Sequence, residues 1–168
     1  VCVFSLEMSA EQLVSRMLAS EGSSDSYKMR KGDLNAEDWE HLAQAAGVLA
    51  ETEILIDDTT GITVTSMKAK LRRVKNLGLV VIDYLQLMQG EKHTDNRVQE
   101  VSDISRNLKL LAKELGVPVI TLAQLSRTSE KENKKPVLSD LRDSGAIEQD
   151  AESIMFLATD SYKNDREK

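Results

Sequence analysis

One short segment restricts the fold of this chain more than any other: the aliphatic run at residues 79–82, which ends at Asp83. Continuous apolar runs of this kind are typical of strands buried on both faces of a parallel sheet. We therefore expect an internal strand that delivers a carboxylate to its carboxyl end. In open α/β sheets, ligands bind beyond that edge.

Similar runs alternate with amphipathic helices along the chain. Further strands are expected at residues 1–6, 54–58, 119–123 and 154–157. Helices are expected after caps at Ser9 and Asn35, from Thr65, and between Asn96 and Gly116. The pattern predicts one α/β domain with a mostly parallel sheet and helices on both faces. The apolar positions expected to face the core in the first two helices are Leu13, Val14, Met17, Leu18, Trp39, Leu42, Ala43, Ala46 and Leu49.

Composition narrows the functional classes. The 168 residues are 40% hydrophobic and 30% charged, which fits one globular domain with a sizeable core. A net charge of −6 argues against a surface that binds polyanions everywhere, although a local basic loop is compatible with it. No apolar run approaches the ~20 residues of a membrane span, and no signal-peptide pattern is present. We expect a cytoplasmic protein, with its single cysteine, Cys2, buried in a strand.

Three polar residues follow expected strands and are candidates for one site. Glu7 could deprotonate an attacking water, Asp83 could hold magnesium through water, and Gln124 could sense a terminal phosphate by hydrogen bonding. Each has a simpler explanation as well. Glu7 could be a charge favoured at a helix N-terminus, Asp83 a cap at the sheet edge, and Gln124 an ordinary polar strand end. Asp57 and Asp58 are expected to form a turn.

A phosphate-cradling loop is missing from this pattern. None of the eight glycines fits the spacing Gly-x-x-x-x-Gly-Lys-[Ser/Thr]. Two acidic strand ends without such a loop are not expected to hold ATP.

Four motifs together carry a resemblance to a family. In order and spacing, they resemble the C-terminal RecA-like motor of bacterial replicative DNA helicases of the DnaB type. The resemblance covers nearly the whole chain, and the last motif is the most specific. The motifs are Ser5-Leu6-Glu7-Met8-Ser9, Ile82-Asp83-Tyr84-Leu85-Gln86-Leu87, Gln124-Leu125-Ser126-Arg127, and residues 138–151 with Leu141-Arg142-Asp143-Ser144-Gly145 and Ile147-Glu148-Gln149-Asp150-Ala151.

The resemblance implies a role for each matching residue. Glu7 would be the catalytic glutamate, Asp83 the magnesium-associated aspartate of the Walker B strand, and Gln124 the residue that couples nucleotide state to DNA. The loop with Arg142, Asp143 and Gly145 would touch the phosphates of single-stranded DNA in the channel of the ring. Asp143 departs from the glutamate common in the family, which shortens its reach; a surface ion pair with Arg142 is the alternative.

Arg127 would add to the DNA-binding surface, in a connection made locally basic by Lys131, Lys134 and Lys135. A solvated loop explains Arg127 and these lysines nearly as well. His93 and His41 are expected to be exposed and without a role.

The resemblance also implies the setting of the chain. Residues 1–168 would be a partial RecA-like P-loop NTPase core that lacks the P-loop strand, the C-terminal strands and the arginine finger. The parent would be a bacterial, nucleoid-associated homohexamer that uses ATP and Mg²⁺, translocates 5′ to 3′ on DNA, and meets primase and a helicase loader. The isolated piece would hydrolyse ATP poorly. Two alternatives remain: a RecA-type recombinase-like ATPase, and a non-catalytic fragment that binds a loader or other partner.

Overall fold

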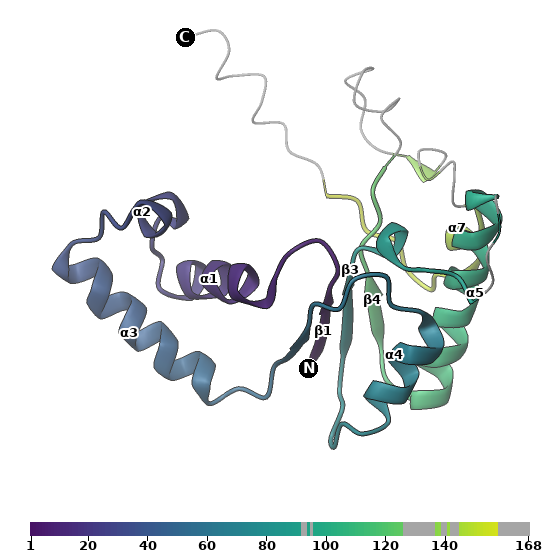
Figure 1. Ribbon diagram of the computed structural model, residues 1–168, viewed down its shortest axis with the longest axis horizontal. Helices are drawn as coiled ribbons and strands as arrows, with labels where there is room; N and C mark the ends of the chain where they lie inside the picture. Colours follow the sequence, from purple (N-terminus) through teal and green to yellow (C-terminus); the bar gives the residue numbers. More distant parts are fainter. Residues whose placement is uncertain (92–93, 95, 126–136, 139–140, 142–144, 158–168) are drawn as a thin grey trace, which may run out of the picture.

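A four-stranded parallel sheet forms the centre of the molecule (Figure 1). The computed structural model describes residues 1–91, 94, 96–125, 137–138, 141 and 145–157. The strands are β1 (Cys2–Ser5), β2 (Leu55–Asp57), β3 (Val80–Asp83) and β4 (Val119–Thr121). The helices are α1 (Ala10–Glu21), α2 (Ser26–Lys31), α3 (Ala36–Ala50), α4 (Val64–Leu71), the 3₁₀ turn η1 (Leu85–Leu87), α5 (Arg97–Leu115) and α7 (Gly145–Asp150).

The strand order is β2-β1-β3-β4, and every neighbouring pair is parallel. This confirms the predicted parallel α/β sheet. The two strands with acidic ends are adjacent in it: β1 pairs with β3 so that Ser5 lies opposite Asp83. All carboxyl ends of parallel strands share one edge, so this register brings the ends of β1 and β3 together.

Local sequence signals set the helix ends. Ser9 closes a capping box with Gln12 at the start of α1, and Asn35 closes another with Asp38 at the start of α3. The longest helix, α5, ends at Gly116, whose φ of 65° lies in the left-handed region that glycine adopts without strain. These ends agree with those expected from the sequence.

The core lies between the sheet and the helices α4 and α5 (Figure 1). Phe4 from β1 and Ile82 from β3 have no exposed surface, and neither do Met67 of α4 and Leu85 of η1. Cys2 is buried among them, as predicted, and burial raises the pKa of its thiol. Hydrophobic burial on this face fixes η1 directly after the end of β3.

The predicted core faces of the first two helices were partly wrong. Trp39 is 62% exposed and Val14 is 40% exposed, and Ala43 and Ala46 are also exposed. In Figure 1, α1, α2 and α3 lie on the other side of the sheet from α4 and α5, and α1 packs chiefly against α3. A helix that packs against one other helix buries a narrower stripe than one packed on a sheet. The buried residues of this pair of helices are Ala19, Leu42 and Ala45.

The expected strand at residues 154–157 does not form. Met155 is 81% exposed and Leu157 is 93% exposed, and no described strand pairs with this segment. An apolar run becomes a strand only where a neighbouring strand takes up its backbone hydrogen bonds. Among the described residues, no helix is long and apolar enough to cross a membrane.

Candidate functional site

The chain segments that leave β1, β3 and β4 are joined by backbone hydrogen bonds beyond the strands themselves. Leu6 N donates to the carbonyl oxygen of Asp83 at 2.7 Å, which ties the exit of β1 to the last residue of β3. On the other side of β3, Leu85 N donates to Leu122 O at 2.9 Å. The three segments that carry Glu7, Asp83 and Gln124 therefore run side by side at one edge of the sheet.

Glu7 lies in the short connection between β1 and α1, and its side chain is exposed. Two contacts hold this connection. The buried Ser5 hydroxyl donates to Met8 O at 2.8 Å, so it spans the residues on both sides of Glu7. Asp58 accepts a hydrogen bond from Ala10 N at 2.9 Å and so fixes the first residue of α1. The result is an exposed carboxylate on a restrained loop.

Asp83 is the last residue of β3 and is half-buried. The peptide bond that follows it is cis. The described residues contain no group of three or more His, Cys, Asp or Glu side chains that could hold a metal by themselves. Mg²⁺ is usually bound by one or two carboxylates together with waters and substrate phosphates rather than by an all-protein cage. A single accessible carboxylate at a strand end fits that kind of site.

Gln124 lies just beyond β4 and is exposed. Its backbone is held by the side chain of Gln86, whose Nε2 donates to Gln124 O at 3.3 Å. The Oε1 of Gln86 accepts from Gln124 N, also at 3.3 Å. The main chain of Gln124 is thus anchored while its own amide side chain faces solvent.

Asp57 and Asp58, which end β2, have different partners. Asp57 accepts from Thr59 N at 3.0 Å, the bond of an Asx turn, and pairs with Lys70 of α4 at 2.5 Å. Partial burial raises the pKa of Asp57, but the hydrogen bonds from Lys70 and Thr59 outweigh it, and the net pKa lies below its ordinary value. Asp58 caps α1 instead. The expected turn accounts for Asp57 but misses the contact of Asp58 with a helix 48 positions away in the sequence.

The predicted DNA-binding residues are only partly placed. Arg127, Arg142 and Asp143 lie outside the described residues, as do Lys131, Lys134, Lys135 and His93. Gly145 begins α7, which packs along α5 and buries Ile147.

One hydrogen bond fastens α7 to α5. The hydroxyl of Ser105, which is 7% exposed, donates to Asp150 Oδ2 at 2.8 Å. Part of the Ile147-Glu148-Gln149-Asp150 motif is therefore used for packing.

Three of these contacts could not be predicted from the sequence pattern: Gln86 with Gln124, Asp58 with Ala10, and Ser105 with Asp150. Each joins residues at least 38 positions apart. Helical and strand periodicity reports only which face of an element is apolar, so it carries no signal for such pairs.

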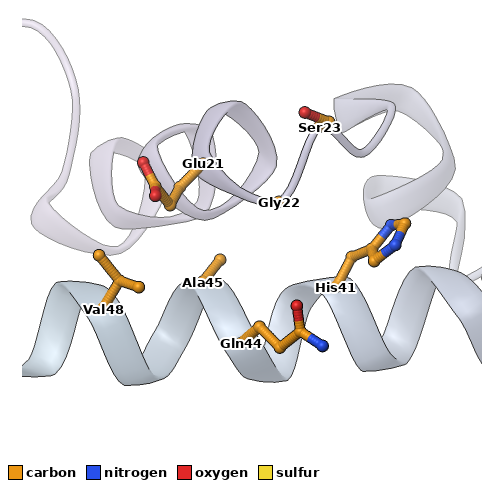
Figure 2. Close-up of a pocket in the computed structure, with 7 residues that line it drawn as sticks. All are labelled: Glu21, Gly22, Ser23, His41, Gln44, Ala45 and Val48. Atoms are coloured by element: carbon orange, nitrogen blue, oxygen red, sulfur yellow. The ribbon is translucent and has the colours of Figure 1, made fainter.

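A separate hollow of about 260 Å³ lies between α1 and α3 (Figure 2). His41, Gln44 and Val48 of α3 line one side of it, and Glu21 lines the other. A Cβ on Gly22 would stand 3.1 Å from Leu18 O and 3.3 Å from His41 O, so glycine allows the close approach of the two helices here. The lining residues all belong to the α1–α3 region rather than to the strand ends, and His41 is exposed as expected.

Comparison with known proteins gives one consistent result. Residues 1–168 match the family described as DnaB-like helicase C terminal domain. The chain is 54% identical to the replicative DNA helicase DnaB of Geobacillus stearothermophilus over 98% of its length. It is 53% identical to the replicative DNA helicase DnaC of Bacillus subtilis over 96% of its length. The match spans 37% of each of these two relatives, so this chain is much shorter than they are.

Solved structures agree with the sequence relatives. A DnaB-like replicative helicase, described together with its interactions with primase, superimposes with a TM-score of 0.91 at 39% identity. The match covers 98% of this chain and 41% of that one. A second solved structure, described as an ATPase domain, superimposes with a TM-score of 0.90 at 40% identity, covering 98% of this chain and 61% of that one. The shared fold is the RecA-like α/β fold.

Proposed function

Because this chain belongs to the DnaB-like helicase C-terminal domain family, we propose that it forms part of the motor of an ATP-dependent replicative DNA helicase. The parent protein would act as a ring-shaped homohexamer that unwinds duplex DNA 5′ to 3′. One observation supports this most directly: β1 and β3 are adjacent, and the Leu6–Asp83 hydrogen bond brings the connection that carries Glu7 next to the end of β3. A carboxylate base beside a magnesium-binding carboxylate is the arrangement that phosphoryl transfer to water needs.

In this proposal, the three residues at the sheet edge have separate tasks. Glu7 takes a proton from the attacking water, since its side chain is exposed while its loop is restrained by Ser5. Asp83 would hold magnesium through water. When bound, magnesium would neutralise negative charge on the terminal phosphates of ATP. Gln124 presents an exposed amide that can hydrogen-bond a phosphate oxygen and respond to its loss.

DNA contact is assigned to the segment that follows β4 and reaches the first residue of α7, Gly145. Arg142 can bond a phosphate with two N–H groups, and Gly145 allows a backbone amide to approach one. Asp143 and Arg127 are included in the same surface. The packing of α7 on α5 holds Gly145, the first residue of α7, next to the body of the domain. Primase and a helicase loader are proposed partners; a relationship with primase is described for one structural relative.

Glu7→Gln in the full-length protein tests the catalytic assignment. The amide keeps the shape of the side chain but cannot accept the proton, so ATP hydrolysis should slow by at least ~10²-fold while ATP binding persists. Glu11→Gln is a matched control, because Glu11 is an exposed glutamate one turn further along, in α1. Normal turnover in Glu7→Gln would remove Glu7 from the mechanism.

Arg142→Ala tests the DNA assignment. Single-stranded DNA affinity should fall, and the slope of log K against log salt should decrease by roughly one phosphate contact for each participating subunit. An ion pair of Arg142 with Asp143 at the surface would instead contribute about 0–1 kcal/mol to stability and leave DNA binding intact.

Assays on the full-length parent separate the alternatives. A RecA-type recombinase would exchange strands without processive unwinding. A non-catalytic, partner-binding fragment would belong to a protein that does not turn over nucleotide.

A further inference from the structure

The side chain of Gln86, in the one-turn 3₁₀ helix η1, contacts the main chain of a residue far away in the sequence. Its amide holds both main-chain polar groups of Gln124, a residue 38 positions away, at 3.3 Å each. We propose that Gln86 is a positioning residue for Gln124. Through this contact, Gln86 would couple the end of β3 to the phosphate-sensing side chain of Gln124. This inference rests on the role proposed above for Gln124.

The geometry explains why a side chain is needed at this point. The β3–β4 ladder ends at the pair Ile82 and Thr121. The last backbone hydrogen bond between the segments that follow these two strands runs from Leu85 N to Leu122 O, at 2.9 Å. Beyond it, the chain after β3 turns away into η1, so Gln124 has no strand partner there. The carboxamide of Gln86 provides both an N–H donor and a carbonyl acceptor, as a neighbouring strand residue would. It extends the sheet hydrogen bonding to Gln124.

Gln86 is itself firmly placed. Arg97, the first residue of α5, donates to Gln86 O at 2.5 Å and to Met88 O at 3.4 Å, and it also pairs with Glu100. On either side of Gln86, Leu85 and Met88 are almost completely buried, at 0% and 1% exposure. The backbone of η1 is therefore fixed by the core and by the start of α5. Because the backbone of Gln86 is held in place, its side chain can restrict the position of Gln124.

The contact with Gln86 uses only the main chain of Gln124 and leaves its side chain available. Both of its main-chain groups are engaged, so its backbone cannot rotate without breaking these bonds, and its side chain remains exposed. Fixing the backbone narrows the positions that the side-chain amide can reach. A sensor that must detect one phosphate oxygen benefits from this restriction, since a misplaced catalytic group loses much of its effect.

The proposal predicts a specific kinetic defect in the full-length protein. Each lost hydrogen bond corresponds to roughly a 2- to 10-fold change in an equilibrium. Gln86→Ala should therefore lower the stimulation of ATP turnover by a single-stranded oligo-dT by roughly 2- to 10-fold, with KM for ATP unchanged. Gln86→Glu keeps the acceptor for Gln124 N but loses the donor to Gln124 O, so it should lower stimulation as well. Gln44→Ala, which removes an exposed glutamine of α3, is the control.

A double-mutant comparison separates positioning from a general structural role. If Gln86 acts through Gln124, adding Gln86→Ala to Gln124→Ala should produce no further loss of stimulation. Additive losses would overturn the proposal, and so would normal stimulation in Gln86→Ala alongside a clear defect in Gln124→Ala. Normal stimulation in Gln124→Ala would instead refute the sensing role of Gln124 under the proposed function, and the positioning role with it.

Discussion

Replacing Ser105 with alanine should loosen α7 from α5. The Ser105 hydroxyl is 7% exposed and donates to Asp150 at 2.8 Å. A hydrogen bond to a charged group contributes about 1.5–3 kcal/mol. Water can replace part of that bond because Asp150 is only half-buried. We therefore expect the free energy needed to detach α7 from α5 to fall by about 1–2 kcal/mol. Hydrogen exchange of the α7 amides should then speed up roughly 5- to 30-fold.

Hydrogen–deuterium exchange measured by mass spectrometry, on peptides that cover Gly145–Asp150, reports this opening in the full-length protein. Ser102→Ala is the matched control: it lies three positions earlier on α5, and its hydroxyl donates to Val98 O of its own helix at 2.9 Å. Equal exchange in the two variants would refute the anchoring role. A combined Ser105→Ala and Asp150→Ala variant should exchange no faster than the Asp150→Ala single variant, because both changes remove the same bond.

Four further substitutions test the fold and its electrostatics. Leu85→Ala removes a side chain with no exposed surface, so it should cost about 2–5 kcal/mol in urea unfolding. Gly47 lies in the interior of α3, where a new Cβ meets no neighbouring group within 4 Å, so Gly47→Ala should raise the free energy of unfolding by ~1 kcal/mol. Gly116 has a φ of +65°, so Gly116→Ala should lower the free energy of unfolding by ~1 kcal/mol. Melting temperatures of the two variants that shift in the same direction would contradict this. The folded state lowers the pKa of Asp57, so its stabilisation is present above the ordinary value of ~3.9 and is lost as pH falls through the lowered value. Asp57→Asn should remove that part of the acid sensitivity, up to ~1 kcal/mol, in unfolding measured from pH 6 to pH 2.

Much of the site could be predicted because its signals are local. A run of apolar residues ending in a carboxylate predicts β3 and Asp83 without any knowledge of the rest of the fold. The same reasoning predicts β1 with Glu7 just beyond it, and the parallel sheet places both at one edge. The roles of these residues come from the resemblance of the motifs to a family, since the spacing leaves simpler explanations open.

The errors arise where a residue's environment depends on distant neighbours. Trp39 recurs at helical spacing and was expected in the core, yet it is 62% exposed because α3 packs on α1 and not on the sheet. Met155 and Leu157 belong to an apolar run, yet no described strand pairs with that segment. Periodicity identifies an apolar face, but it does not say whether another element covers it.

The sequence by itself determined where α1 and α3 begin and where α5 ends, since caps such as Ser9, Asn35 and Gly116 act within one helical turn. It also determined that the sheet is parallel, because continuous apolar strands separated by helices have few other solutions. The tertiary structure alone decided which groups meet: the order β2-β1-β3-β4, the anchoring of Gln124 by Gln86, and the bond from Ser105 to Asp150. These contacts join residues 38 and 45 positions apart, and the chain can form them only after the register of the sheet and the packing of α5 are established.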